Sequence, residues 1–138
     1  MKVALTPEKV SGSLIEFRKG LNGKTGAKER FGVERSDDAV PSIISNVMQT
    51  FDGRELYASV EEKAANLLYF MVKNHPFLDG NKRNGAFAFV WFLRRAKILD
   101  VSKITPSALT ALTILIANSD PKDKDRVVAL ILNLITKK

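Results

Sequence analysis

The chain has 138 residues, of which 45% are hydrophobic and 27% charged, a composition typical of one folded globular domain and not of a disordered chain. It has no cysteine, which excludes disulfides, thiolate metal sites and thiol nucleophiles. The net charge of +7 predicts a basic surface that attracts nucleic acid, phosphorylated cofactors or acidic proteins.

Neither a secretion signal nor a membrane segment is expected. The first ten residues contain no long apolar region, and the longest wholly apolar run, residues 86–93, is far shorter than the ~20 residues of a transmembrane helix. A cytoplasmic protein is therefore expected. The cations gather at 24–30, 82–83 and 94–97 without interleaved aromatic side chains, so a solvated basic face is favoured over nucleic-acid binding.

The first part of the chain is predicted to contain two helices separated by a loop. Residues 6–19 begin with Thr6 as a candidate N-cap followed by proline, although Gly12 weakens this helix. Residues 20–35 are rich in glycine and charge, which predicts a loop. A short helix is predicted over 38–49.

Residues 49–58, QTFDGRELYA, have the short-range pattern of a β-hairpin. The turn pair Asp52–Gly53 is flanked by Phe51 on one side and by Leu56 and Tyr57 on the other. A single hairpin leaves a strand edge to which an extended segment of a partner protein can add. An irregular connection before the next helix fits the sequence equally well.

The clearest helix is predicted between Ser59 and Asn74. Ser59 and Glu62 have the spacing of a capping box. One helical stripe is apolar and consists of Val60, Ala64, Leu67, Leu68, Met71 and Val72. The helix must end near Asn74, because Pro76 disfavours helical geometry at His75.

Three more helices are predicted after it. The helix over 81–96 contains GAFAFVWFL, which is apolar on every side and is therefore expected at the centre of the core. Thr105–Pro106 and Asp120–Pro121 are each a cap followed by proline, which predicts helices over 106–118 and 121–136. The predicted fold class is all-α.

The loop at 74–85, NHPFLDGNKRNG, concentrates chemically active groups between the two central helices. The backbone N–H groups at the start of the second helix lack intrahelical partners, so they form a potential anion site. Gly80 allows close approach to a phosphate, and Arg83 offers a planar fork for its oxygens. Asp79 offers a hard oxygen ligand for magnesium. His75, the single histidine, is suited to accept a proton near neutral pH.

Structural roles explain the same residues at this point. A histidine at a helix end often donates to the last carbonyls, and Asp79 and Asn81 are common N-cap residues. Lys82 and Arg83 are equally explained as solvated cations. Phe77 is interpreted as a core anchor in either case.

The nine residues HPFLDGNKR resemble the signature of the Fic/Doc family, HxFx(D/E)GN(G/K)R, and match it at every specified position. The helices on either side are also similar to the family, so the resemblance covers about residues 45–100. It implies one Fic/Doc-like helical-bundle domain over 1–138, with the hairpin as a flap. It also implies an enzyme that moves a phosphate-containing group from ATP to a Ser, Thr or Tyr hydroxyl of a target protein.

The resemblance implies a role for each residue of the motif. His75 would be the general base that deprotonates the target hydroxyl, and Arg83 would neutralise developing charge. Asp79 would bind Mg²⁺ between the nucleotide phosphates. ATP, or another nucleoside triphosphate, would be bound by the amides of Gly80, Asn81 and Lys82, by the Asn81 side chain, and by Arg83.

Two departures bear on the reaction that the resemblance implies. Family members that transfer AMP usually have glycine in place of Lys82 and a second arginine in place of Ala86. Both departures are similar to Doc, which transfers the γ-phosphoryl group, so phosphoryl transfer is slightly favoured. The sequence HPF and Gly80 are more similar to Fic, so AMP transfer (adenylylation) stays the alternative. A non-catalytic nucleotide or nucleic-acid binding module is the other alternative, but it needs neither His75 nor Asp79.

Two protein partners are implied. The flap at 50–57 would align the target protein by main-chain pairing. The self-inhibitory segment of many Fic proteins, (S/T)xxxE(G/N), has only a chance match at 25–29, which is followed by arginine. A separate, antitoxin-like inhibitor is therefore expected.

Overall fold

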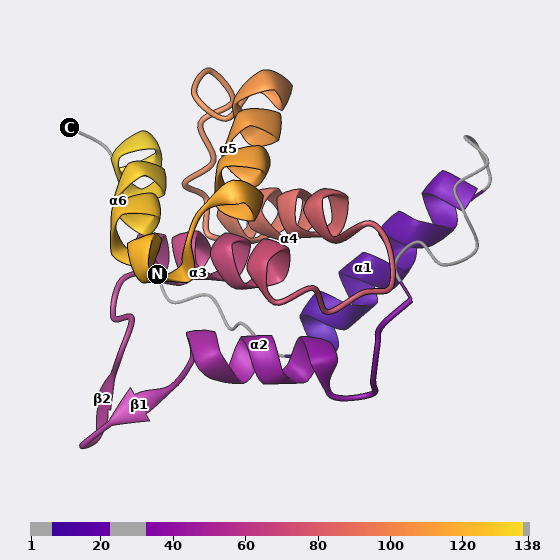
Figure 1. Ribbon diagram of the computed structural model, residues 1–138, viewed down its shortest axis with the longest axis horizontal. Helices are drawn as coiled ribbons and strands as arrows, with labels where there is room; N and C mark the ends of the chain where they lie inside the picture. The colour runs from indigo at the N-terminus through magenta and orange to yellow at the C-terminus, as the bar shows by residue number, and fades with distance from the viewer. Residues whose placement is uncertain (1–6, 23–32, 137–138) are drawn as a thin grey trace.

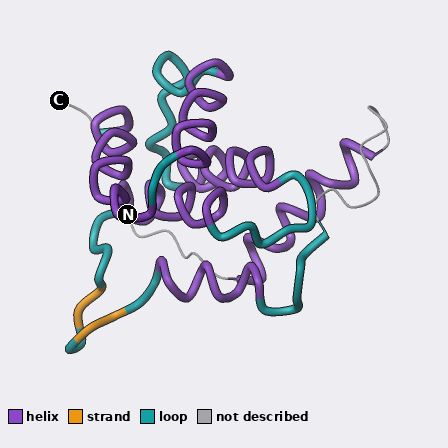
Figure 2. The backbone as a smooth tube through the Cα atoms, viewed as in Figure 1, coloured by secondary structure: helices purple, strands orange, loops and turns teal. Residues whose placement is uncertain are grey.

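The computed structural model describes residues 7–22 and 33–136, and these residues form the predicted all-α fold (Figures 1 and 2). The elements are α1 (Pro7–Asn22), α2 (Ala39–Val47), β1 (Thr50–Phe51), β2 (Arg54–Glu55), α3 (Val60–Lys73), α4 (Asn81–Arg95), α5 (Pro106–Asn118), the 3-10 turn η1 (Pro121–Asp123) and α6 (Lys124–Ile135). α3 and α4 run antiparallel through the middle, with α2 on one side and α5 on the other (Figure 1). Within the described ranges, no helix has the length and apolarity that crossing a membrane requires.

α1 is longer than predicted. It continues to Asn22, so the loop predicted over 20–35 was wrong at its first three residues. Gly12 disfavours a helix by about 1 kcal/mol, but α1 packs against α2 and α4, and tertiary packing outweighs such propensity costs. Thr6 and residues 23–32, with most of the predicted loop, lie outside the described residues.

α3 lies at the centre of the core. It packs against α2, α4, α5 and α6, and nearly all of its residues between 63 and 72 are buried. The sequence had suggested α4 for this place, but α4 buries one side and leaves Phe87, Val90 and Trp91 half-buried. The prediction failed because Lys63 and Asn66 look like surface residues and are in fact buried. The Lys63 ammonium and Asn66 Nδ2 each donate a hydrogen bond there.

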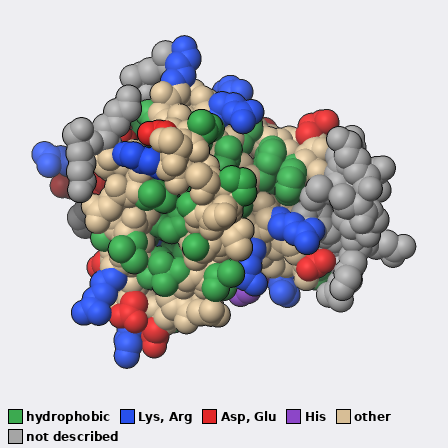
Figure 3. Space-filling view, turned by 90° about the horizontal axis from the view of Figure 1, so that it is seen from above, with side chains coloured by type: hydrophobic (Ala, Val, Ile, Leu, Met, Phe, Trp, Pro, Cys, Tyr) green, Lys and Arg blue, Asp and Glu red, His purple; other side chains and the backbone are tan. Residues whose placement is uncertain are grey.

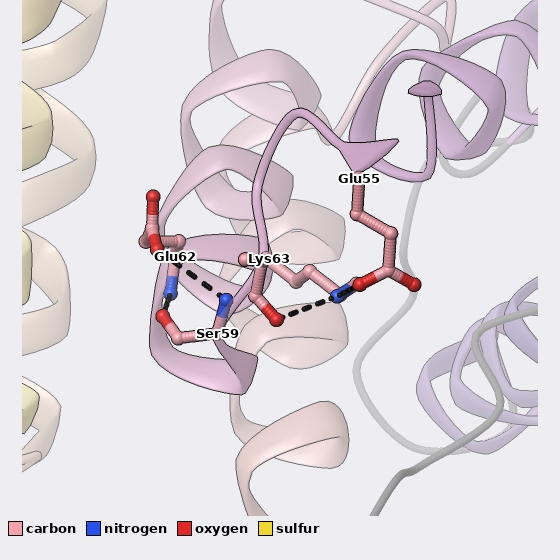
Figure 4. A network of polar contacts seen from close by, with 5 residues as sticks. Glu55, Ser59, Glu62 and Lys63 are labelled. Carbon is pink, nitrogen blue, oxygen red and sulfur yellow. Dashed lines mark hydrogen bonds and ion pairs between the residues drawn. The ribbon is translucent and has the colours of Figure 1, made fainter. Parts of the chain in front are cut away.

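The predicted hairpin is confirmed. β1 and β2 pair antiparallel around a turn in which Asp52 and Gly53 have positive φ (53° and 78°). Lys63 of α3 connects the hairpin to this helix. Its ammonium donates to Glu55 Oε2 (2.9 Å) and to the carbonyl of Ala58 (3.3 Å) (Figure 4). The Lys63 side chain is 9% exposed and that of Glu55 is 32% exposed, so the ion pair is partly shielded from solvent and links β2 to the start of α3.

The predicted helix caps are confirmed. Ser59 Oγ accepts from the Glu62 N–H (3.0 Å), and the Glu62 carboxylate accepts from the Ser59 N–H (3.3 Å) (Figure 4). The Thr105 side chain caps α5. The Asp120 side chain also caps, but the helix predicted over 121–136 opens as a 3-10 turn, so α6 begins at Lys124.

α6 is joined to α3 by an ammonium that lies over aromatic rings. Lys124 Nζ lies 4.6 Å from the ring centroid of Phe70, 5.2 Å from that of Tyr57 and 5.8 Å from that of Tyr69. It also donates to the Tyr57 hydroxyl (2.9 Å). Burial raises the pKa of Tyr69, and the charge of Asp120 raises it further, so this phenol stays neutral beside the ammonium.

α3 and α4 pack closely at Gly85, on the second turn of α4. A Cβ atom at this position would lie 3.2 Å from Met71 Cβ and 3.2 Å from Val72 Cγ2. Such contacts are tighter than close-packed cores normally hold, so the glycine permits the approach of the two helices. The loop that joins α3 to α4 is held between these two closely packed elements.

Gly85→Ala is expected to lower the free energy of unfolding by about 1–3 kcal/mol relative to Gly12→Ala. Both changes favour helix by a similar amount, but a Cβ at Gly12 meets nothing within 4 Å, whereas one at Gly85 overpacks the crossing. Urea unfolding of the two variants measures the difference. Equal free energies of unfolding would mean that α3 and α4 move apart to accommodate the added Cβ without loss of stability.

Candidate functional site

The candidate site is the loop between α3 and α4. α3 ends at Lys73 with Asn74 as its C-cap, whose N–H donates to the Phe70 carbonyl (2.9 Å). His75 follows with a left-handed backbone (φ 49°) and an exposed side chain. As predicted, the proline at 76 coincides with the end of the helix. The imidazole is therefore displayed at the surface by a turn that few non-glycine residues adopt.

Lys73 fixes the end of α3 against another helix. Its ammonium donates to the carbonyls of Ile116 (3.3 Å), Ala117 (3.4 Å) and Ser119, which lie at the C-terminal end of α5. A cation at this end also complements the negative end of the α5 dipole. The last residue of α3 before the loop is thereby tied to α5.

Phe77 and Asn81 give the loop its shape. The Phe77 ring is buried (2% exposed), which confirms the predicted core anchor. The Phe77 N–H donates to Asn81 Oδ1 (2.9 Å), and Asn81 Nδ2 donates to the Phe77 carbonyl (3.0 Å). The Asn81 side chain, for which the family resemblance implied a phosphate contact, is thus engaged in closing the loop. Its backbone amide lies in the first turn of α4.

A short segment before α2 pairs with the loop, and this pairing was not predicted from the sequence. Leu78 N–H donates to the Val33 carbonyl (2.8 Å), and Glu34 lies opposite Phe77 in an antiparallel bridge. The Arg35 N–H donates to the carbonyl of residue 76 (2.8 Å), and Arg35 Nε donates to that of residue 75 (2.8 Å). The loop is therefore held along one edge by backbone that is about 40 residues away in the chain.

The first turn of α4 has the features of an anion site. Gly80 is the N-cap, with a left-handed backbone (φ 83°, ψ 24°) and no side chain to cap the helix. The amides of Gly80, Asn81 and Lys82 stand at the start of the helix, where backbone N–H groups have no acceptor in a preceding turn. Lys82 and Arg83 are exposed on the same turn and add positive charge. Asp79, also exposed, directly precedes the cap.

Asn84 stabilises this turn from the buried side. Its backbone N–H and its Nδ2 both donate to the Gly80 carbonyl (2.9 Å each). Its Oδ1 is buried without a hydrogen-bond partner in the described structure. The left-handed Gly80 is thus fixed by two hydrogen bonds to its carbonyl.

A groove runs from the site along α5. It has a volume of about 390 Å³ and is lined by Lys82, Arg83 and Ala86 of α4 and by Leu109, Thr110, Thr113 and Ile114 of α5. A second hollow of about 480 Å³ continues it along α5 and shares Thr110 and Ile114. Viewed from above, exposed hydrophobic side chains lie on this face with Lys and Arg side chains around them (Figure 3). Cations thus mark one end of a largely apolar groove.

All predicted site residues lie on this one loop and the helix turn after it. His75, Asp79, Lys82 and Arg83 are exposed, whereas Gly80 and Asn81 are half-buried. The described residues contain no group of three or more acidic or histidine side chains that could hold a metal ion alone. A magnesium ion would fit only with oxygens from a bound phosphate beside Asp79, which is its usual mode in nucleotide sites.

The hairpin lies at the other end of α3 from this loop (Figures 1 and 2). α3 has 14 residues, so the two features are separated by about 21 Å of helix. Any target segment that contacts both the hairpin and His75 must cover that distance.

Comparison with known proteins identifies the family. The sequence model of the Fic/DOC family matches residues 11–93, which include α2, α3, the hairpin, the whole loop and most of α4. No curated protein and no solved structure matches the chain at a significant level. The match extends over more than half of the chain and includes the loop with His75 and the start of α4. The chain therefore belongs to the Fic/DOC family, whose members use nucleotides in transfer reactions.

Proposed function

We propose that this protein transfers a phosphate-containing group from ATP, or another nucleoside triphosphate, to a hydroxyl group of a target protein. The observation that carries the proposal is the pairing of an exposed His75 with the uncapped start of α4 on one fixed loop. An anion site alone would serve binding. A base beside it, at the position where a hydroxyl would approach the phosphate, serves transfer.

The phosphates bind at the first turn of α4 in this proposal. The amides of Gly80, Asn81 and Lys82 surround the phosphate oxygens, and Arg83 neutralises charge that develops in transfer. Asp79 would hold Mg²⁺ together with phosphate oxygens, and the ion would supply charge neutralisation and orient the phosphates. The chain itself contributes the fixed loop, so little reorganisation is needed when the nucleotide binds.

His75 accepts the proton in the chemical step. In phosphoryl transfer, the target oxygen forms a bond to the γ-phosphorus, the bond from that phosphorus to its bridging oxygen breaks, and ADP leaves. The hydroxyl proton passes to the imidazole. In the alternative, AMP transfer, the same oxygen attacks the α-phosphorus, and pyrophosphate leaves with His75 in the same role.

Phosphoryl transfer is slightly favoured by the groove beside α4. Lys82 occupies space that glycine would leave open, and Ala86 lines the groove where an arginine would add a phosphate clamp. The missing arginine removes one planar phosphate clamp from the part of the groove next to the first turn of α4. AMP transfer is the alternative that the labelling experiment below separates.

The target protein adds to the hairpin in this proposal. An extended segment rises about 3.3 Å per residue, so roughly six residues would span the 21 Å between the hairpin and the loop. The modified residue is therefore expected about six positions from the segment that pairs with β1 or β2. The test is to map the modified residue and then to delete three residues between it and the segment of the target that pairs with the hairpin. An unchanged rate of transfer would exclude this spacing.

A separate inhibitor protein is proposed to control the activity. The self-inhibitory pattern at residues 25–29 lies outside the described residues and lacks its final residue. The groove, with Lys82 and Arg83 at one end and apolar side chains along α5, suits a partner with acidic and apolar side chains. The purified chain alone should then be active; activity that appears only after removal of part of the chain would contradict this.

The test uses ATP labelled at either the α or the γ phosphate, incubated with the purified protein, Mg²⁺ and cell lysate. Transfer of label from γ-labelled ATP alone indicates phosphorylation, and transfer from α-labelled ATP indicates AMP transfer. No protein labelling from either, with ATP still bound, would indicate the non-catalytic binding module instead. Binding of ATP is measured separately by calorimetry.

A further inference from the structure

The turn that presents His75 lacks the bonds that usually hold such turns. In left-handed helix ends, the N–H groups of the two residues after the C-cap donate to carbonyls of the last helical turn. The second of these residues is Pro76, which has no N–H. Among the described residues, the His75 N–H also donates to no backbone carbonyl. Some other contact must keep His75 at its positive φ of 49°.

Arg35 makes that contact. Its Nε donates to the His75 carbonyl (2.8 Å), and its backbone N–H donates to the Pro76 carbonyl (2.8 Å). The two carbonyls that flank the His75–Pro76 peptide turn are therefore both bound by one residue. A guanidinium is a charged donor of fixed planar geometry, so it restrains a carbonyl direction more strongly than a neutral donor does.

The backbone around Arg35 is itself fixed. On one side, the Val33 carbonyl accepts from the Leu78 N–H (2.8 Å). On the other side, Glu34 Oε1 accepts from the Val40 N–H in the first turn of α2 (2.9 Å). Arg35 therefore connects the loop to α2. This helix packs on the opposite side of α3 from α5 (Figure 1).

We propose that Arg35 is a positioning residue, which holds the backbone of His75 in the left-handed conformation that displays the imidazole at the surface. The proposal rests on the function proposed above, in which His75 is the base. Without the guanidinium, His75 is released to the more common backbone conformations, and its ring points elsewhere. A misplacement of a reacting group by about 1 Å costs up to about 100-fold in rate, so a loss of about 10- to 100-fold is expected.

The single histidine allows a direct test by NMR. Since the chain has one imidazole, its ¹H–¹³C signals need no assignment among several residues. Arg35→Met removes the donor, and Arg35→Lys keeps the charge but not the planar fork. Arg94→Met is the matched control, because it removes the same charge from an exposed position in the last turn of α4, about 20 Å along the helix from the loop.

We expect the imidazole signals to shift or broaden in Arg35→Met, to change less in Arg35→Lys, and to stay unchanged in Arg94→Met. In transfer assays, kcat should fall about 10- to 100-fold in Arg35→Met with KM for ATP nearly constant, and Arg35→Lys should recover part of the loss. Imidazole signals identical to the wild type in Arg35→Met would overturn the proposal, as would shifted signals with unchanged kcat.

The two hypotheses fail separately. If the wild-type protein transfers no label, the proposed function is wrong, and the NMR comparison still decides whether Arg35 sets the geometry of residue 75. If the wild type is active and the NMR signals do not move, the positioning role alone is wrong. The spectra also report directly whether each variant is folded.

Discussion

Replacing His75 with asparagine is expected to lower the rate of label transfer about 10²- to 10⁴-fold while the protein stays folded. Asparagine lacks a group that accepts a proton near neutral pH, but it tolerates a positive φ better than most residues do. It therefore removes the proposed base and keeps the turn at the end of α3. Initial rates with γ-labelled and α-labelled ATP measure the effect.

His75→Ala provides the harsher comparison. Alanine removes the base and also places a β-carbon without polar atoms at φ 49°, which costs roughly 1–2 kcal/mol. We expect equal loss of activity in both variants and a lower melting temperature only in the alanine variant. If either variant transfers label at the wild-type rate, His75 is not the base, and the proposed mechanism is wrong.

ATP binding separates a lost base from a lost nucleotide site. The amides at the start of α4 and Arg83 do not depend on the imidazole, so the affinity for ATP should change less than threefold in His75→Asn. Arg83→Gln should instead weaken binding and transfer together. A His75 variant that no longer binds ATP would place the imidazole in nucleotide binding and not in proton transfer.

Local sequence signals predicted most of the helices and the hairpin. Ser59, Thr105 and Asp120 cap the helices as their spacing implied, because a cap depends on bonds within three residues. The Asp52–Gly53 turn formed the hairpin for the same reason, since both residues tolerate positive φ. The residues of the motif are nearly consecutive, so one loop brings them together without any long-range prediction.

What the sequence did not predict depends on contacts between distant residues. Arg35 and the loop are 40 residues apart, and nothing in the composition of residues 33–35 indicates an extended pairing. Lys73 caps α5 and not its own helix, although a lysine in the last turn of α3 suggests the latter. The central position of α3 was missed because Lys63 is buried against the hairpin.

These distant contacts share a physical consequence. The loop receives one restraint from α2 through Arg35, one from α5 through Lys73, and one from the core through Phe77. A site built this way keeps its geometry before the substrate arrives, which lowers the reorganisation needed in the transition state. The restraint from the core is the largest in free energy and is also the simplest to remove.

Phe77→Ala is expected to lower the free energy of unfolding by about 3–5 kcal/mol. The ring is 2% exposed and belongs to the central cluster of buried side chains, so its removal leaves a cavity that the backbone cannot fill. A loss of this size is a large fraction of the roughly 5–15 kcal/mol that stabilises a typical domain. Urea unfolding should show a lower midpoint with a nearly unchanged slope.

Leu78→Ala is the matched control. Leu78 is the next residue of the same loop, but its side chain is 38% exposed, and its backbone bond to Val33 does not depend on the side chain. We expect a loss below about 1 kcal/mol. Similar losses in both variants would mean that Phe77 does not anchor the loop in the core.

The activity of Phe77→Ala at low temperature then tests which of these restraints sets the position of His75. The two bonds between Asn81 and residue 77 involve the backbone of residue 77 and survive the loss of the ring. If they and Arg35 suffice to shape the loop, the folded fraction of the variant should transfer label within about tenfold of the wild-type rate. A loss as large as that of His75→Asn in fully folded protein would instead show that burial of the ring sets the position of the base.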